Sequence, residues 1–188
     1  MKSPIFTDKR SKSIIFLAHC ILNQNAVSDG TASYPGFVNE ILEFINSTDC
    51  GIVQMPCPEL HCLGLDRGDP KGGTRPVLEE NTRIRKGMSN IDSIEKTKQL
   101  AQQVIYQIIE YIKHGFEVKG IIGINRSPSC GVESTSKNNK EVAGEGVFIS
   151  ELSNKLIKKN IYINIVGIKV FEPENAIIKL KNLLGTGG

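Results

Sequence analysis

Four short runs of apolar residues alternate with longer amphipathic segments along this chain. The runs are SIIFLA, GIVQM, VKGIIGI and IYINIVGI, and they predict buried strands at residues 13–18, 51–55, 118–124 and 161–168. Apolar residues at helical spacing predict helices over residues 36–47, 92–114, 146–159 and 174–184. Strands that alternate with helices form βα units, so we expect an α/β fold. The expected architecture is an open three-layer sandwich, Rossmann-like, with a mainly parallel sheet of four or five strands and helices on both faces.

The length of 188 residues suits one domain, which we expect to span residues 1–188. Residues 1–12 and 185–188 are polar or glycine-rich, and we expect both ends to be flexible. From residue 56 to about residue 87 the chain is dense in glycine and proline, which predicts a long irregular connection. A connection of this length inside a small domain is usually functional. A second loop, rich in glycine and serine, is expected over residues 125–136.

The composition excludes several classes of partner. There are 23 basic and 20 acidic residues, and the lysines are spread out, so we expect no nucleic-acid partner. No segment resembles an export signal or a membrane span, so we expect a cytoplasmic protein that binds no membrane. In a reducing compartment five cysteines are not expected to form disulfides, which leaves metal binding, catalysis or burial. The composition does not predict an oligomeric state.

Three cysteines share a position relative to the predicted strands. Cys20, Cys57 and Cys130 each follow the end of a strand, and the carboxyl ends of parallel strands meet at one edge of a sheet. Three thiolates at one edge suit an iron–sulfur cluster, zinc or Cu(I), although motifs of the CxxC type are absent. Three ligands leave one coordination position open, which indicates substrate binding rather than a structural site.

Burial as small hydrophobic residues is the alternative for any of these cysteines. We favour that interpretation for Cys50, which precedes a strand. Cys62 lies five residues after Cys57 and could be a fourth ligand, a sulfur relay or a spectator.

Two polar residues near the cysteines are candidates for catalysis. Glu59 follows Cys57 by two residues, and in a dry pocket its carboxyl would have a raised pKa and could move protons. Ser127 precedes Cys130 by three residues and could hydrogen-bond a reacting atom. A solvated loop glutamate and a serine that only caps a turn are the alternatives.

Further residues are candidates for the walls of the pocket. The backbone N–H groups at Gly131 could bond cluster sulfurs or anions. A second wall is expected from Asn23, Asn25, Asp29 and Gly30, and contacts to a polar substrate from Arg67, Asp69, Arg75 and Arg126. The segment around Asp69 could equally consist of turn formers. His19 and His61 could be ligands or proton carriers, or structural histidines, and His114 suits a helix C-terminus.

At these residues the chain resembles the thiouracil desulfurase family. The resemblance is carried by IIFLAHCIL followed by SDG, by the CPE tripeptide at residues 57–59, and by SPSCG at residues 127–131. It implies a 4Fe–4S cluster held by Cys20, Cys57 and Cys130, whose open iron binds the sulfur of a small thiolated substrate. It further implies Glu59 as the catalytic acid or base and Ser127 as the catalytic serine. The implied reaction is non-redox: water replaces sulfur on carbon, and sulfide leaves.

The chain departs from the family pattern at two places, which indicates a divergent branch. CILNQN and AVSDG stand where the family usually has CLLG and RYDG, and LHCLGLDRGDP replaces a glycine-rich segment after CPE. The expected activity is therefore desulfuration of a thiolated nucleobase or a similar small thioamide. A non-catalytic carrier of metal, cluster or sulfur is one alternative, and a cysteine-nucleophile hydrolase with a Cys–His pair is another.

Overall fold

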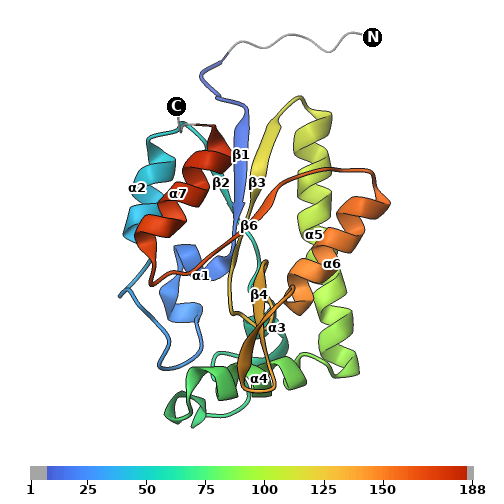
Figure 1. Ribbon diagram of the computed structural model, residues 1–188. Coiled ribbons are helices and arrows are strands. Elements are labelled where there is room, and N and C mark those ends of the chain that lie inside the picture. The colour runs from blue at the N-terminus through green and yellow to red at the C-terminus, as the bar shows by residue number, and fades with distance from the viewer. Residues whose placement is uncertain (1–7, 186–188) are drawn as a thin grey trace.

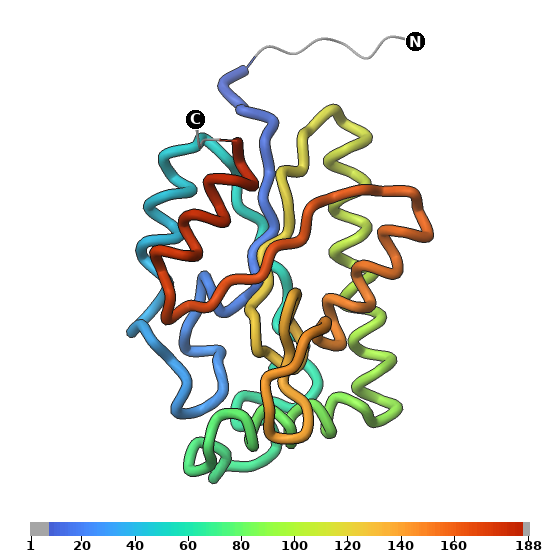
Figure 2. The backbone as a smooth tube through the Cα atoms, in the orientation of Figure 1, coloured from blue at the N-terminus to red at the C-terminus, as the bar shows by residue number. Residues whose placement is uncertain are grey.

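The structure, a computed structural model, describes residues 8–185 and contains the predicted parallel sheet (Figures 1 and 2). Four strands pair in parallel in the order β2-β1-β3-β6. Their bounds are β1 Ser13–Leu17, β2 Gly51–Gln54, β3 Glu117–Ile124 and β6 Ile165–Ile168. The prediction of an α/β fold with a four-stranded parallel sheet is confirmed.

Helices cover both faces of this sheet. On one face lie α2 (Asn39–Asn46) and α7 (Pro173–Leu184), which contact each other, and on the other lie α5 (Ile91–Lys113) and α6 (Val147–Lys158) (Figure 1). The apolar stripe of α5 is buried in the core, as its spacing predicts. The predicted three-layer sandwich is therefore present, with the apolar side chains of β1 at its centre.

The strand order brings three loops to one edge of the sheet. β1 lies between β2 and β3, so the chain crosses β1 on its way from β2 to β3. Two short helices follow β1, namely α1 (His19–Leu22) and η1 (Gln24–Ala26), and α3 (Pro58–Leu63) follows β2. Ligands of doubly wound sheets bind at the carboxyl edge, beside the point where the strand order reverses.

The prediction of an irregular connection from residue 56 to 87 is wrong for most of that segment. It contains α3, a 3-10 turn η2 (Gly72–Thr74) and the helix α4 (Val77–Gly87). The sequence conceals α4 because its buried positions are Glu80, Asn81 and Ile84, so it has no apolar stripe.

Three other predictions need correction. Residues 134–143 form an antiparallel hairpin of β4 (Ser134–Lys137) and β5 (Lys140–Ala143), so the loop predicted over residues 125–136 ends in a strand. Asn138 and Asn139 both have positive φ, which suits the tight turn of a hairpin. Residues 161–164 pair in no strand, and the helix predicted from residue 36 begins at Asn39.

The ends of the chain are described only in part. Residues 8–12 form no helix or strand and are exposed, and Gly185 ends α7 in a left-handed conformation. The remaining residues of the two predicted flexible ends, 1–7 and 186–188, lie outside the described residues. Among residues 8–185 no helix is long and apolar enough to cross a membrane.

Candidate active site

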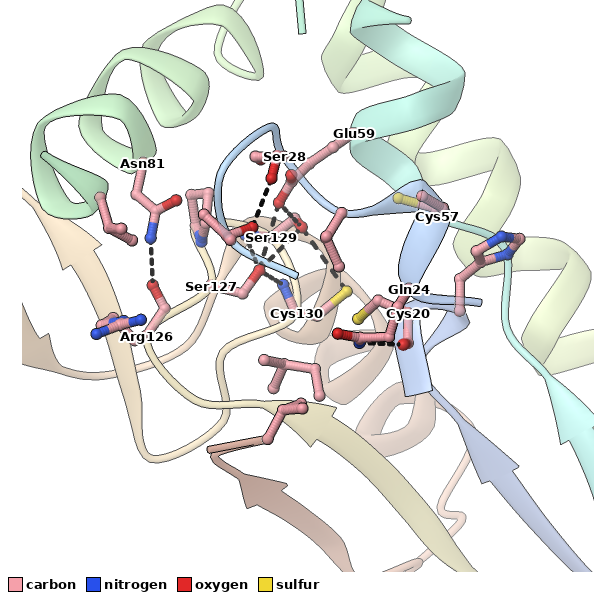
Figure 3. A pocket seen from close by; sticks show the side chains of 18 of the residues that line it. Cys20, Gln24, Ser28, Cys57, Glu59, Asn81, Arg126, Ser127, Ser129 and Cys130 are labelled. Atoms are coloured by element: carbon pink, nitrogen blue, oxygen red, sulfur yellow. Dashed lines mark hydrogen bonds between the residues drawn. The ribbon is translucent and has the colours of Figure 1, made fainter. Parts of the chain in front are cut away.

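A cavity lies at the carboxyl edge of the sheet, and Cys20, Cys57 and Cys130 all line it (Figure 3). Each of the three loops that follow β1, β2 and β3 contributes one of these cysteines. Cys20 and Cys57 are 37 residues apart in sequence (57 − 20), and Cys57 and Cys130 are 73 apart (130 − 57). The sheet topology brings them to one cavity, as the alternation of strands and helices predicts. Other parts of the wall come from α4 and from the segment after β6.

Local structure fixes each cysteine. Cys20 lies in the single turn of α1, and Cys57 is the N-cap of α3, where its sulfur accepts a hydrogen bond from the Leu60 N–H at 3.4 Å. Pro58 occupies the first position of α3, where no backbone donor is needed. The Ser127 hydroxyl oxygen accepts the backbone N–H of Cys130 at 3.0 Å, which closes the turn that carries the third thiol.

Burial favours the neutral thiols when no cation is present. It raises the pKa of Cys20 to about 12 and of Cys57 to about 11, and it raises the pKa of Cys130 well above the ordinary value. Negative charge on a neighbouring thiolate adds to the effect at Cys20 and Cys130. A bound metal supplies the positive charge that such a cluster of thiolates needs.

Three cysteine thiols from three loops are a donor set that suits an iron–sulfur cluster. Within the described part of the chain, no group of three His, Cys, Asp or Glu residues is placed to hold one metal ion. A four-iron cluster binds each cysteine at a different iron, so its ligand sulfurs need not converge on one point. The Cys57 sulfur also lies 3.9 Å from an Arg67 N–H donor, a partner that favours a thiolate.

Glu59 lies beside the thiols, and each of its two oxygens has its own partners. Oε1 accepts hydrogen bonds from Ser129 Oγ at 2.5 Å and Ser127 Oγ at 3.3 Å. Oε2 accepts from Arg67 Nε at 3.2 Å, in an ion pair whose side chains are almost completely buried. The Glu59 carboxylate is therefore buried with a guanidinium against one oxygen and two serine hydroxyls against the other.

These side chains meet on one side of the cavity. Figure 3 shows Glu59, Ser127 and Ser129 gathered next to Cys130, with Cys20 close to Cys130. Ser127 Oγ accepts two backbone N–H groups, from Ser129 and Cys130, and its single hydrogen is directed to Glu59. Both catalytic candidates from the sequence thus lie in direct hydrogen-bond contact next to the thiols.

The family model of 2-thiouracil desulfurase matches residues 15–161, a range that includes all three cysteines, Glu59 and both serines. The chain belongs to this family. The uncharacterized protein MJ0003 of Methanocaldococcus jannaschii is 32% identical over 157 residues, which cover 84% of this chain and 86% of that protein. Among solved structures, the 4Fe–4S-dependent thiouracil desulfidase TudS aligns with a TM-score of 0.48 and 17% identity, covering 89% of this chain and 98% of that one. The resemblance to the thiouracil desulfurase family is confirmed.

The cavity also contains residues that the sequence alone does not indicate. Ser129 is buried and makes the shortest contact to Glu59. Gln24 is buried beneath Cys20: its amide donates to the Cys20 carbonyl at 2.6 Å and accepts from the Ser33 N–H at 3.0 Å. The second serine of SPSCG was the available signal for Ser129, whereas nothing in the local sequence singles out Gln24.

The pocket-wall candidates divide into two groups. Arg126 lines the cavity, with its guanidinium 4.9 Å from the centre of the Phe171 ring. Asn23, Asp29 and Gly131 are not among the lining residues. Asn23 instead caps η1, and Asp29 packs against Gly73. The Gly131 N–H, expected to face the cluster, donates to the Ser127 carbonyl at 3.2 Å.

The other candidates have structural surroundings. Cys62 Sγ lies 3.6 Å from the Ser93 carbonyl and does not line the cavity, which favours the spectator interpretation over a fourth ligand. His61 lies beside it in a separate surface pocket. His19 does line the cavity, and burial lowers its pKa, with the charges of His61 and Arg67 adding to the effect.

Arg75, a substrate-contact candidate, pairs with Asp69 at 2.5 Å and with Glu80 at 3.1 Å. Neither Arg75 nor Asp69 lines the cavity. This pair holds the loop before α4 in place.

Cys50 is half-buried and packs against the core, which agrees with its interpretation as a small hydrophobic residue. His114 ends α5 and bonds the Glu110 carbonyl at 2.8 Å, as expected for a histidine at a helix C-terminus.

Proposed function

We propose that this protein removes sulfur from a thiolated nucleobase or a similar small thioamide. The overall reaction replaces a C=S group with C=O, consumes one water and releases hydrogen sulfide, without a change of redox state. The observation that carries the proposal is the contact of Glu59 with two serine hydroxyls in a cavity walled by three thiols. Membership of the 2-thiouracil desulfurase family supports the substrate class.

The residues that would hold a 4Fe–4S cluster are Cys20, Cys57 and Cys130. Three thiols on three loops of one cavity, of which Cys130 is buried and the other two half-buried, are a donor set that suits iron and sulfide. With three protein ligands, the cluster would supply one Lewis-acidic iron whose soft character favours sulfur over the oxygen of the product.

Glu59 is the group that would manage protons. Its Oε1 atom is the oxygen directed toward the serines and the thiols, so it would take a proton from the attacking water and return one to the leaving sulfur. Ser127 and Ser129 donate to this same oxygen and fix its direction. Ser127 Oγ, held by two backbone N–H groups, is placed to orient the water or the substrate.

Arg126 and Phe171 would contact the substrate at the rim of the cavity. Both line it, and Phe171 is half exposed, so a planar ring could pack near its side chain. Lys169 also lines the cavity, but its ammonium is bound to Glu141 at 3.2 Å.

The two alternatives from the sequence receive less support. A cysteine-nucleophile hydrolase needs a thiolate activated by histidine, but the cysteine hydrogen bonds within residues 8–185 involve no histidine. The raised pKa values of Cys20 and Cys57 also disfavour free thiolates. The hypothesis of a non-catalytic carrier gives no role to the hydrogen bonds that Glu59 makes with Ser127, Ser129 and Arg67.

The test is an anaerobic assay of the reconstituted protein against a panel of thiolated pyrimidines. We expect stoichiometric sulfide and oxo product from at least one of them, and a complete loss of turnover in Glu59→Ala at unchanged iron content. A loaded protein that releases no sulfide from any member of the panel would contradict the proposed function.

A further inference from the structure

We propose that Arg67 is a positioning residue that fixes both the Glu59 carboxylate and the Cys57 sulfur for the reaction. The inference rests on the proposed function and extends it to a side chain that lines the cavity and would act through Glu59 and Cys57. Its guanidinium is 2% exposed and lies where the loops after β1 and β2 meet.

All five N–H donors of this guanidinium have an acceptor. Nε donates to Glu59 Oε2 at 3.2 Å, and Nη1 donates to the Gly64 and Leu65 carbonyls at 2.8 and 3.0 Å. Nη2 donates to the Ala26 carbonyl at 2.5 Å and to Cys57 Sγ at 3.9 Å. Arginine has five donors in a planar fork, so every one of them is used here.

These bonds connect segments that carry the site. Ala26 ends η1, which follows the turn of Cys20, while Glu59 and Cys57 belong to the start of α3. Because Oε2 of Glu59 is occupied by Arg67, only Oε1 is left to face the serines. The guanidinium thereby fixes the orientation of the carboxylate, with one oxygen directed to the serines.

The backbone at Arg67 is held as firmly as its side chain. Its φ of +55° lies in the left-handed region, which is uncommon for a residue with a side chain. Its carbonyl accepts a hydrogen bond from Arg83 Nη2 at 2.9 Å, and Arg83 in turn pairs with Glu80. Strained backbone that the surroundings hold in place is frequent at functional sites.

The contact with sulfur gives the proposal a readout that does not depend on turnover. Hydrogen bonds and positive charge next to a ligand sulfur stabilise the reduced state of an iron–sulfur cluster. Loss of the guanidinium should therefore lower the reduction potential. An arginine that served only to fold the loop would leave the potential unchanged once the cluster is bound.

The experiment compares Arg67→Ala and Arg67→Lys with the wild type, and Arg75→Ala serves as a control in the same loop. In Arg67→Ala we expect a lower reduction potential and a fall in kcat on the order of 100-fold, with KM little changed. Millimolar guanidinium should restore part of this kcat. Arg67→Lys keeps the charge but has three donors, so we expect it to bind the cluster and remain slower than the wild type.

Two results would overturn the inference. If Arg67→Lys has the kcat and the reduction potential of the wild type, the five hydrogen bonds of the guanidinium are not required. This result is informative even if Arg67→Ala fails to fold. If loaded Arg67→Ala differs from the wild type no more than Arg75→Ala does, the positioning role is wrong while the proposed function stands. A wild type that binds no cluster overturns both.

Discussion

Ser129 Oγ donates a 2.5 Å hydrogen bond to Glu59 Oε1, across 70 residues of sequence. Ser129 immediately precedes Cys130, and Glu59 follows Cys57 by two residues. The bond therefore ties the loops that carry two of the three thiols, at the point where the carboxylate faces the cavity. Substitution of Ser129 should therefore change the orientation of the Glu59 carboxylate more than it changes the fold.

Replacement of Ser129 by alanine removes the shortest hydrogen bond to Glu59. We expect kcat to fall on the order of 100-fold because the catalytic carboxylate loses its orientation. Sulfide release by the loaded variant, at an iron content equal to that of the wild type, is the measurement. Ser153→Ala is the control. Ser153 lies in α6, outside the cavity, and its hydroxyl donates to Glu145, so this variant should retain activity. Equal rates for the two variants would rule out this role for Ser129.

Arg126→Met tests the rim of the cavity. The guanidinium lies over Phe171, and its backbone is held by hydrogen bonds from Ser136 Oγ and Asn81 Nδ2 to the Arg126 carbonyl. If Arg126 donates to a polar atom of the substrate, KM should rise about tenfold, with a smaller change in kcat. Steady-state kinetics with the best thiolated substrate measure both constants. A fall in kcat at constant KM would instead place Arg126 in the chemical step.

Gly123→Ala tests how tightly the third cysteine loop packs on β3. A Cβ at Gly123 would lie 2.4 Å from the Cys130 carbonyl oxygen, so the loop would have to shift. We expect a loss of about 1–3 kcal/mol in the free energy of unfolding, together with weaker cluster binding. Gly36→Ala is the matched control, since its Cβ would meet no atom within 4 Å. Urea unfolding and iron content check both effects, and a Gly123→Ala protein that matches the control in both would contradict the packing argument.

Glu80→Gln tests the acid dependence of stability. Hydrogen bonds and charge from Arg83, and then from Arg75, lower the pKa of Glu80 from its ordinary 4.5. A lowered pKa in the folded state means that the ionised carboxylate stabilises the protein above about pH 4.5 and that this contribution is lost as the pH falls through the lowered value. The wild type should therefore lose more stability between pH 7 and acid pH than the Gln variant does. Urea unfolding at both pH values measures this, with the neighbouring Glu79→Gln as control; parallel losses in wild type and Glu80→Gln would contradict it.

The sheet and the thiols were predictable because they depend on regular patterns. Continuous apolar runs predict buried parallel strands, and the position of a cysteine after each strand predicts a shared edge. The same reasoning missed α4, because the face it buries includes Glu80 and Asn81, whose polar groups find partners only in the folded chain.

The network around Glu59 was predictable only in part. CPE and SPSCG indicate Glu59 and Ser127, but the choice between Ser127 and Ser129 depends on a contact between segments 70 residues apart. The sequence indicates Arg67 only as a candidate for contact with a polar substrate, and its burial against Glu59 and Cys57 appears only in the folded chain. Of the predicted second wall, Asn23 instead caps η1, and Asp29 packs against Gly73.

The most direct measurement is the iron and acid-labile sulfide content of the anaerobically reconstituted protein and of its single cysteine variants. The wild type should contain about four iron and four sulfide per chain. Cys20→Ser, Cys57→Ser and Cys130→Ser should each lose most of both, while Cys50→Ser and Cys62→Ser should retain them. Full iron and sulfide in any of the first three variants, or a wild type without acid-labile sulfide, would contradict a cluster held by these three thiols.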